Sequence, residues 1–294
     1  MRILVTGAGG FLGRHVARRL LTDGFEVTGF DLVTGSMPDI SWVEGDLRDH
    51  DAVATAAHGH QLICHLGAIG DVYMAAEHPA LAAQVNVVGC ANVALAAEAV
   101  GAKVVYASTW EVYGEACYEP VDENHPCAPD HPYSITKLAG ERILLAADRL
   151  RRVPVISLRL GTAYGPGLRP NSVFRIFVDK ATRGEPITIQ GDGLQGRQFT
   201  HASDLAGAFS SACRSGLHGS AFNVVAPEQI TIKQLAEAVV ARYPTEISFG
   251  DPRPGDAPPA MVSAEKARRL LGWEPLVSFE EGVAGLMDHL EGGG

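Results

Sequence analysis

Several features are scarce or missing in this sequence of 294 residues, and each absence excludes a class of protein. There is no run of Lys and Arg and the formal net charge is -10, so we expect neither a nucleic-acid partner nor an anionic membrane surface. The five Cys form no C-x-x-C pair, which predicts reduced thiols in a cytoplasmic protein rather than a disulfide framework. We find no apolar run long enough to span a bilayer and no H-E-x-x-H motif, so neither a membrane partner nor a bound metal is expected.

What the sequence does contain is a regular alternation of short apolar runs and helical patterns. Buried strands that alternate with helices are typical of parallel sheets with helices on both faces. The predicted fold class is therefore α/β, a Rossmann-type doubly wound parallel sheet with a smaller mixed α/β C-terminal lobe. Strands are expected at residues 3–6, 26–31, 41–44, 61–66, 103–108, 155–160 and 221–227, and helices at residues 11–21, 52–57, 84–100, 133–150, 173–183 and 232–242.

The pattern changes after Gly165-Pro166-Gly167, which marks the expected boundary between two parts. Residues 1–165 are assigned to the sheet domain, and residues 195–226 are expected to complete it. Residues 166–194 and 227–294, where Gly and Pro recur between interrupted helices, are assigned to a substrate-binding lobe.

A glycine-rich turn follows the first expected strand. The segment T-G-A-G-G-F-L-G places Gly7, Gly10 and Gly13 three residues apart, and Phe11 and Leu12 open the next helix. Glycines let the backbone approach a pyrophosphate, and the helix N-terminus behind them favours negative charge. A strand, such a turn and a helix at the start of a βαβ unit predict a dinucleotide-binding site.

An acidic residue at the end of the second expected strand indicates which dinucleotide binds. Asp31 lies 24 residues after Gly7, where a carboxylate accepts hydrogen bonds from the ribose 2′- and 3′-hydroxyls and repels a 2′-phosphate. No Arg follows Asp31 directly, so the predicted cofactor is NAD rather than NADP. The other interpretation of Asp31 is a helix-cap or turn residue.

Two further segments are expected to lie along the dinucleotide. Asp46 and Leu47 follow the third strand, where Asp46 either meets the adenine edge or serves as a turn residue. Leu66 and Ala68 stand at the end of the fourth strand, and small residues there let a dinucleotide lie flat. His65 is interpreted as a strand-end histidine of the core.

A Ser-Thr pair, a Glu and a Tyr-x-x-x-Lys motif occur between Ser108 and Lys137. Tyr133 and Lys137 are four residues apart, so on a helix they share one face. An ammonium beside a phenol favours the phenolate, which makes Tyr133 a candidate general base. Thr109 and Glu111 stand at the end of the preceding strand and are candidates for the same cleft.

These motifs occur in the order and at the spacings of a known family. The segments TGAGGFLG, YSITK and RLGTAYGPG resemble the TGxxGxxG, YxxxK and RxxNVYGPG motifs of the extended short-chain dehydrogenases/reductases, in their branch of NAD-dependent sugar epimerases and dehydratases. The segments GDGLQGRQFTHASDLAGAF, RPGD and LLGWEP are similar to the nucleotide-sugar and C-terminal segments of that family. The resemblance covers nearly the whole chain and is to UDP-glucose 4-epimerase-like members.

The resemblance implies a role for each motif residue. Tyr133 would take the proton of a sugar hydroxyl, Lys137 would lower the pKa of Tyr133 and bind the nicotinamide ribose, and Thr109 would hydrogen-bond the sugar hydroxyl. Ser108 would contact the cofactor, and Asn86 would hold the cofactor or an active-site water. The implied substrate contacts, beside Thr109, are Thr162, Arg169, Arg197 and Arg253, of which the last two would neutralise the substrate diphosphate.

The implied activity is that of an NAD-dependent nucleotide-sugar 4-epimerase, which acts through a transient 4-keto intermediate on a UDP-hexose or UDP-uronic acid. Thr162 departs from the motif, which has Asn there, and Trp110 stands where dehydratases carry Asp or Ser. Glu111 would then have to be both acid and base in an elimination, which favours epimerisation over a dehydratase or a decarboxylase. A non-catalytic NAD-binding regulator is the remote alternative, against which the intact pair of Tyr133 and Lys137 counts.

The two long helices expected at residues 84–100 and 133–150 carry apolar residues on more than one face. A monomer would have to expose this surplus apolar surface. Members of the family commonly pair these two helices across a dimer axis, so a homodimer is expected.

Overall fold

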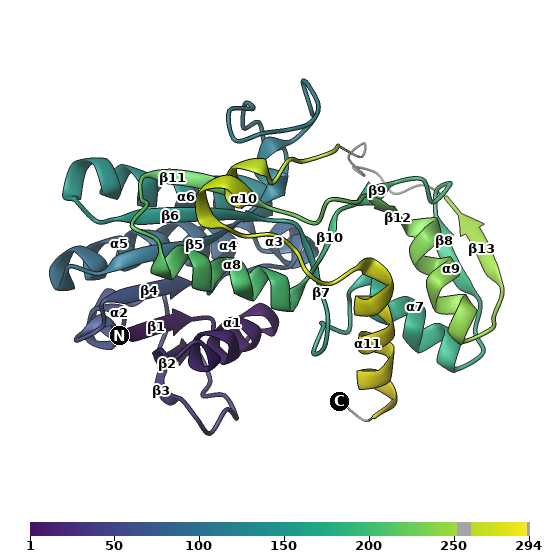
Figure 1. Ribbon diagram of the computed structural model, residues 1–294, viewed down its shortest axis with the longest axis horizontal. Helices are drawn as coiled ribbons and strands as arrows, with labels where there is room; N and C mark the ends of the chain where they lie inside the picture. The colour runs from purple at the N-terminus through teal and green to yellow at the C-terminus, as the bar shows by residue number, and fades with distance from the viewer. Residues whose placement is uncertain (252–259, 293–294) are drawn as a thin grey trace.

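The computed structural model describes residues 1–251 and 260–292 and shows two lobes of unequal size (Figure 1). The larger lobe is built on a seven-stranded parallel sheet with the strand order β11-β6-β5-β4-β1-β2-β3. The order reverses between β1 and β4, and ligands of such sheets bind at the carboxyl ends of the strands at this point. The predicted fold class is thus confirmed. The strands are β1 (Arg2–Thr6), β2 (Glu26–Asp31), β3 (Ser41–Glu44), β4 (Leu62–His65), β5 (Lys103–Thr109), β6 (Val155–Leu160) and β11 (Ser220–Val224).

Helices cover both faces of this sheet. One face packs against α1 (Phe11–Thr22) and α8 (Ala202–Arg214), and the other packs against α2 (His50–Ala57), α5 (Gly89–Val100) and α6 (Pro132–Arg151). Ile3 and Val5 of β1 lie in the first core, while Leu4 between them lies in the second. Burial on both faces explains why the strands read as continuous apolar runs in the sequence.

Capping residues set where the helices begin. Helix α2 starts two residues before its expected position, because the side chain of Asp49 accepts hydrogen bonds from the N–H groups of Asp51 and Ala52 at 2.9 and 3.1 Å. Helix α6 starts at Pro132, and His131 caps it by accepting the Tyr133 N–H. Proline suits the first helical position because the N–H it lacks would have no partner there.

The stretch Pro79–Val100 is one continuous run of helix. Helix α4 (Pro79–Ala83) passes through a π-helical turn, η1 (Gln84–Val88), into α5. By length and composition this stretch is long and apolar enough to cross a membrane, so the expectation that no such run exists was wrong. In the fold, half of its most apolar window is buried, and α5 packs against α2 and α6.

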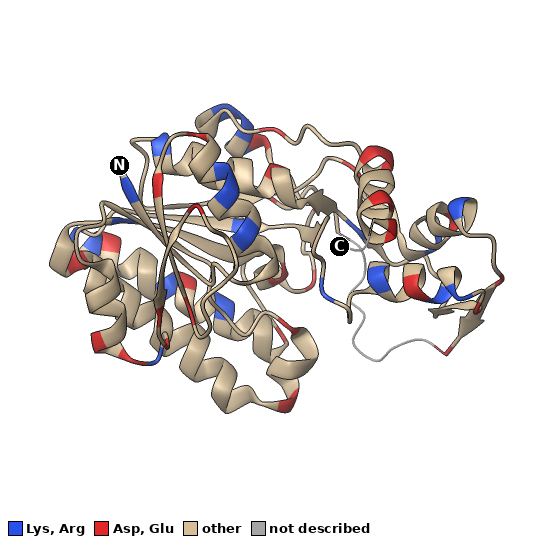
Figure 2. Ribbon diagram, turned by 90° about the horizontal axis from the view of Figure 1, so that it is seen from below, with Lys and Arg blue, Asp and Glu red and all other residues tan. Residues whose placement is uncertain are grey.

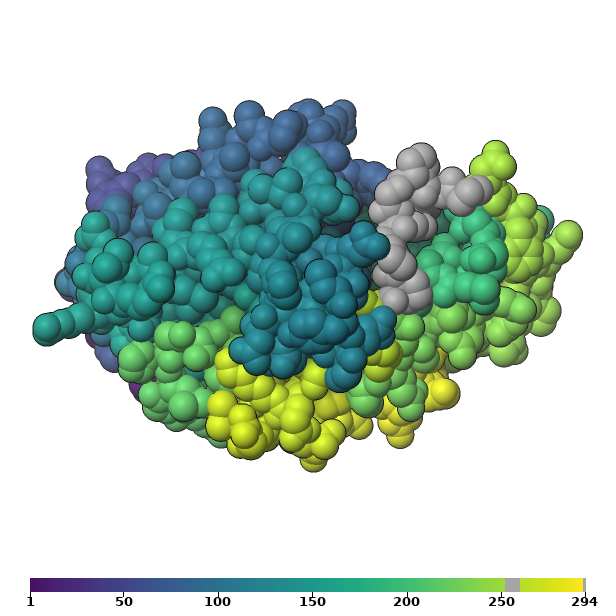
Figure 3. All heavy atoms as spheres, turned by 90° about the horizontal axis from the view of Figure 1, so that it is seen from above, coloured from purple at the N-terminus to yellow at the C-terminus, as the bar shows by residue number. Residues whose placement is uncertain are grey.

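The smaller lobe has its own core, which α7 (Val173–Thr182), α9 (Ile232–Arg242) and α11 (Phe279–Glu291) share with the parallel pair β8 (Ile187–Gln190) and β13 (Ile247–Gly250). In Figure 3 this lobe is the mainly green part at the right, and acidic and basic residues are interspersed over both lobes (Figure 2). The chain enters the smaller lobe more than once, because it returns to the larger lobe in between. There β11 pairs with β6, and α10 (Glu265–Leu271) packs on β11 and α8. Two short pairs, β7 (Thr162–Tyr164) with β10 (Phe199–His201) and β9 (Gly196–Arg197) with β12 (Ile230–Thr231), lie along these crossings.

Candidate active site

A cavity of about 470 Å³ opens at the carboxyl ends of the central strands. Its walls come from the glycine-rich turn after β1, the end of β5, the first turns of α6 and the segment around β7. The fold therefore brings together segments that are far apart in the sequence. The predicted site residues that line this cavity are Gly7, Gly10, Phe11, Leu12, Gly13, Leu66, Ala68, Ser108, Thr109, Glu111, Tyr133, Lys137, Thr162 and Arg169.

The glycine-rich turn is packed so closely that side chains are excluded at two positions. Gly7 has a φ of +70°, and a Cβ there would lie 2.6 Å from the backbone nitrogen of Gly67. A Cβ on Gly13 would lie 1.9 Å from the carbonyl oxygen of Gly7. Helix α1 therefore starts directly against the turn, and the cradle fits the pyrophosphate of a dinucleotide at a helix N-terminus.

A second cavity of about 570 Å³ adjoins the first at the same turn and contains Asp31, Asp46 and Leu47. The Asp31 carboxylate accepts hydrogen bonds from the N–H groups of Gly9 and Leu32 at 2.9 and 2.8 Å, so it is fixed at the cavity wall. Asp46 accepts the N–H of Arg48 at 2.9 Å, as expected for the turn residue that was one of its two interpretations.

Arg48 lines this second cavity and was missed by the sequence reasoning. Its Nε donates to the two carboxylate oxygens of Asp46 at 2.9 and 3.1 Å, and these bonds hold the pKa of Asp46 below its usual range. The D-L-R triplet after β3 was the available signal. Because this guanidinium is already paired with Asp46, it is not a ready partner for a ribose 2′-phosphate.

We expect the chain to bind NAD at least about tenfold more tightly than NADP, a difference of about 1.4 kcal/mol. Substitution of Asp31→Ser removes the carboxylate that repels the 2′-phosphate and should shrink this ratio. Competitive calorimetric titration of both dinucleotides measures it. The exposed Asp39→Ser is the matched control, and equal affinity of the unaltered chain for NADP would contradict the assignment of Asp31.

Thr109, Tyr133 and Lys137 converge on the first cavity from β5 and α6. Thr109 ends β5, and its hydroxyl accepts the N–H of Glu111 at 3.3 Å, which starts the 3₁₀ turn η2 (Trp110–Tyr113). Tyr133 is the second residue of α6, and Lys137 follows one turn later, only 3% exposed. The shared helix face expected of Tyr133 and Lys137 therefore borders the cavity.

The pKa of the Tyr133 phenol is raised in the structure, whereas the sequence predicted a lowered pKa. Burial of the phenol raises the pKa of Tyr133 above its usual range, and the charge of Glu111 raises it further. The Thr109 hydroxyl and the charge of Arg169 act in the opposite direction. The lowering of this pKa by Lys137 that the resemblance implies stays a prediction. The Lys137 ammonium lies over the ring of Tyr106, with Nζ 4.2 Å from the ring centroid.

Glu111 lies in the wall of the same cavity, beside Trp110. Burial raises the pKa of the Glu111 carboxyl, although the charge of Arg197 opposes this effect. Its other interpretation was a hydrogen bond to the backbone of the following turn. Within the residues that the structure describes, the Glu111 side chain makes no such bond, so its carboxyl is available to a ligand.

Asn86 lies in the π-helical turn and is buried behind the cavity wall. Its side chain accepts the N–H of Ile69 at 2.8 Å, donates to the Ile69 carbonyl at 3.2 Å and donates to the hydroxyl of Thr136 at 3.0 Å. Asn86 is not among the described residues that line the two cavities, and its implied role in holding the cofactor or an active-site water stays a prediction. Asn86 thus joins the loop after β4, which borders both cavities, to helix α6.

Arg197 lines a separate, smaller cavity of about 190 Å³ that shares Thr162 and Phe199 with the first. Its guanidinium lies over the ring of Trp110, which lines the first cavity, at 5.8 Å from the ring centroid. Gln190 and Gln195 also line this small cavity and were not predicted. The alternation of apolar and polar residues in the sequence of β8, I-T-I-Q, was the available signal for Gln190. Arg253, the remaining predicted contact, lies outside the described residues.

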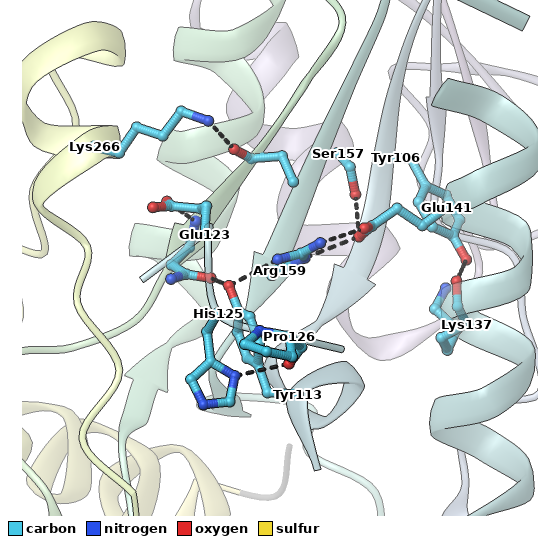
Figure 4. A network of polar contacts seen from close by, with 12 residues as sticks. Tyr106, Tyr113, Glu123, His125, Pro126, Lys137, Glu141, Ser157, Arg159 and Lys266 are labelled. Carbon is cyan, nitrogen blue, oxygen red and sulfur yellow. Dashed lines mark hydrogen bonds and ion pairs between the residues drawn. The ribbon is translucent and has the colours of Figure 1, made fainter. Parts of the chain in front are cut away.

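An ion pair behind the cavity joins β6 to α6 (Figure 4). The Arg159 guanidinium donates to the two carboxylate oxygens of Glu141 at 2.6 and 3.2 Å, and these side chains are 4% and 0% exposed. Ser157 donates to Glu141 at 2.9 Å, and Arg159 donates to the hydroxyl of Tyr113 at 2.8 Å. Burial would raise the pKa of Glu141, but the bonds and charge of Arg159 hold it below its usual range.

Comparisons with known proteins agree with this geometry. Residues 3–225 match the sequence profile of the NAD dependent epimerase/dehydratase family. The UDP-glucose 4-epimerase of Mycolicibacterium smegmatis is 33% identical over 302 residues, which cover 97% of this chain and 96% of that protein. The crystal structure of UDP-glucose 4-epimerase from Thermotoga maritima with UDP-glucose superimposes with a TM-score of 0.94 at 29% identity and covers 100% of this chain and 99% of that one.

A second similar structure contains both a nucleotide sugar and NAD. The UDP-glucuronic acid 4-epimerase of Bacillus cereus, in complex with UDP-glucuronic acid and NAD, has a TM-score of 0.92 at 26% identity, with 99% of each chain covered. Because the matched profile spans most of the chain and the relatives align from end to end, this chain belongs to the NAD dependent epimerase/dehydratase family, and NAD is its cofactor.

Proposed function

We propose that this protein is an epimerase of UDP-sugars that inverts the configuration at C4 through a 4-keto intermediate. The observation that carries the proposal is the convergence of Thr109, Tyr133 and Lys137 on a cavity that is continuous with the dinucleotide turn. The UDP-sugars named for the relatives support the choice of nucleotide.

The chain's own residues handle the proton of the reaction. Tyr133 takes the proton of the 4-hydroxyl and later returns it, while Thr109 hydrogen-bonds the same hydroxyl and Lys137 provides positive charge behind them. NAD, when bound, supplies the acceptor that takes the C4 hydrogen with its two electrons and gives it back, and its positive charge favours the phenolate of Tyr133. Inversion requires the ketone to present its opposite face before that hydrogen returns.

Glu111 decides between this reaction and an elimination. Burial raises the pKa of the Glu111 carboxyl, which lines the reaction cavity together with Thr109 and Tyr133. Trp110 beside it has no acid to offer to a leaving hydroxyl. We therefore assign Glu111 to substrate orientation, and a dehydratase or a uronic acid decarboxylase that uses Glu111 is the alternative.

The function is tested by incubation in deuterated water with UDP-glucose, UDP-galactose, UDP-glucuronic acid and UDP-galacturonic acid. The uronic acids are included because the Arg169 cation lines the cavity and would pair with a C6 carboxylate. We expect one pair to interconvert with no change in mass and no deuterium in the product. Loss of water or of carbon dioxide, read by mass spectrometry and NMR, would replace the epimerase with the alternative.

The same experiment on Glu111→Gln separates the two roles of this residue. An orienting Glu111 leaves C5 free of deuterium in both proteins, and the substitution changes only the rate. Deuterium at C5 that disappears in Glu111→Gln identifies a base at C5 and overturns simple C4 epimerisation.

We further propose that the protein is a homodimer paired through α5 and α6, which lie side by side. Val88 and Leu95, seven residues apart on one helical face, are 46% and 38% exposed, and Ile135 on α6 is 46% exposed. We expect light scattering at micromolar concentration to give the dimer mass and Leu95→Asp to give the monomer. Leu276→Asp, at an exposed position outside these helices, should remain dimeric. A monomeric unaltered chain would contradict the proposal.

A further inference from the structure

Lys137 is a buried ammonium with an unusual set of neighbours. Its side chain is 3% exposed, and burial lowers its pKa to about 8. Within residues 1–251 and 260–292, no carboxylate forms an ion pair with it, although the charge of Glu141 one turn further along α6 acts on it from a distance. Since an unpaired buried charge is costly, another group has to stabilise the charged form.

Tyr106 contacts Lys137 at two places (Figure 4). The face of its ring lies beneath the ammonium, with Nζ 4.2 Å from the ring centroid, which is within the range of a cation–π interaction. Its hydroxyl donates a hydrogen bond to the backbone carbonyl of Lys137 at 3.3 Å. Tyr106 itself is 1% exposed and is held in β5 between β4 and β6.

A glycine in α6 allows this close contact. A Cβ on Gly140 would lie 3.0 Å from the hydroxyl oxygen of Tyr106, 2.6 Å from the sulfur of Cys90 and 2.7 Å from the carbonyl oxygen of Asn86. Real Cβ atoms essentially never approach to the last two distances. Any side chain at position 140 would therefore push α6, and Lys137 with it, away from Tyr106.

His65 of β4 packs beside Tyr106 and is itself in contact with Thr6 of β1. The ring of His65 lies 5.5 Å from the Tyr106 ring, and His65 Nδ1 lies 2.7 Å from the hydroxyl of Thr6, directly before the glycine-rich turn. The other ring nitrogen of His65 lies 3.4 Å from the Cys90 sulfur. Burial lowers the pKa of His65 to about 3, so this layer contributes no second positive charge near Lys137 at neutral pH.

We propose that Tyr106 is the positioning residue for Lys137. The ring face of Tyr106 keeps the Lys137 ammonium charged, and the hydroxyl of Tyr106 fixes the backbone of α6 relative to β5. No substrate or cofactor contact is assigned to it. The titratable groups that face Lys137 are Tyr106 from β5, His65 from β4, Cys90 from α5, and Tyr133 and Glu141 from α6. Of these, Tyr106 contacts the ammonium directly, and Glu141 is engaged with Arg159.

The test measures the pKa of Lys137 itself, so it does not depend on the proposed function. The chain has five Lys, and ¹³C-labelled lysine gives each of them an NMR signal that titrates separately. Loss of one signal in Lys137→Arg identifies Lys137. We expect the pKa of Lys137 to stay near that of the unaltered protein in Tyr106→Phe, which keeps the ring, and to fall by about one unit in Tyr106→Leu, which removes it.

A second series covers the case in which Tyr106→Leu does not fold. Fluorinated phenylalanines at position 106 keep the shape of the ring while they withdraw charge from its face, so the pKa of Lys137 should fall stepwise with each added fluorine. Phe222→Leu is the matched control, because Lys266 lies over the Phe222 ring at 4.6 Å, and it should change the titration of Lys266 but not of Lys137. A pKa of Lys137 that stays constant across the fluorinated series overturns the proposal.

The pH dependence of kcat separates this proposal from the proposed function. If the charged form of Lys137 serves the reaction, activity falls as the pH rises through its pKa, and Tyr106→Leu moves this alkaline limb down by the same shift that NMR records. If the pKa of Lys137 shifts in the NMR titration while the alkaline limb of kcat stays in place, Tyr106 is the positioning residue of Lys137. The charge of Lys137 then has no part in the rate-determining step.

Discussion

Substitution of Tyr133→Phe is expected to lower turnover of the UDP-sugar by about two to four orders of magnitude, the usual scale for loss of a positioned acid or base. In the proposed mechanism the phenol exchanges a proton with the 4-hydroxyl, and Phe keeps the ring but has no such proton. His131 caps helix α6 by accepting the backbone N–H of Tyr133, which the substitution keeps, so the fold should be unchanged. Initial rates at saturating substrate measure the effect.

Two controls make the result specific. Thermal unfolding and NAD titration of Tyr133→Phe should match the unaltered protein, because the removed oxygen lies in the reaction cavity and not in the core. Tyr118→Phe removes a phenol that is exposed on a loop and should retain full activity. If Tyr133→Phe keeps activity within tenfold of the unaltered protein, the base is another group.

Substitution of Arg159→Met should lower the free energy of unfolding by about 3–5 kcal/mol, because it leaves the Glu141 carboxylate buried without its partner. The double variant Arg159→Met with Glu141→Met removes both charges and should recover most of the loss, since an apolar pair of similar volume often replaces a buried ion pair without cost. Chemical denaturation at neutral pH measures both. A single variant as stable as the unaltered chain would contradict this account of the pair.

The size of the Arg159→Met effect should depend on pH in a defined direction. In the unaltered chain the pKa of Glu141 is lowered, so the pair contributes stability above the ordinary pKa of 4.5, and the contribution is lost as the pH falls further. In Arg159→Met burial raises the pKa of Glu141, so that protein loses stability as the pH rises above 4.5. The difference between the two proteins should therefore be largest near neutral pH and shrink under acidic conditions.

Local signals in the sequence predicted the elements whose pattern depends on few residues. The glycine-rich turn, Asp31 at the end of β2 and the pair of Tyr133 and Lys137 needed only their own spacing, and the structure places each of them at a cavity. Helix α8 was not predicted, although the apolar residues of Ala202–Arg214 recur with helical spacing.

Contacts between distant segments were beyond the reach of the sequence. Asn86 lies in a π-helical turn, and its side chain accepts the N–H of Ile69. Nothing in the residue pattern indicates that the helix changes pitch there. Tyr106 and Lys137 meet only because α6 packs closely on β5, so the position of the ammonium over a ring could not be anticipated.

Strand β11 also limits how chains of this kind can exchange parts by recombination. It joins the sheet beside β6 only after the chain has passed through α7 and β8, and β12, α9 and β13 follow it. A single junction near Gly165 would take β6 from one parent and β11 from the other, with no guarantee that the register of Leu158 with Phe222 and its neighbours survives. A mismatched β11 leaves β6 as a bare edge that invites pairing with another molecule. New sugar preferences are therefore more accessible through point substitutions in the cavity wall than through transfer of the smaller lobe.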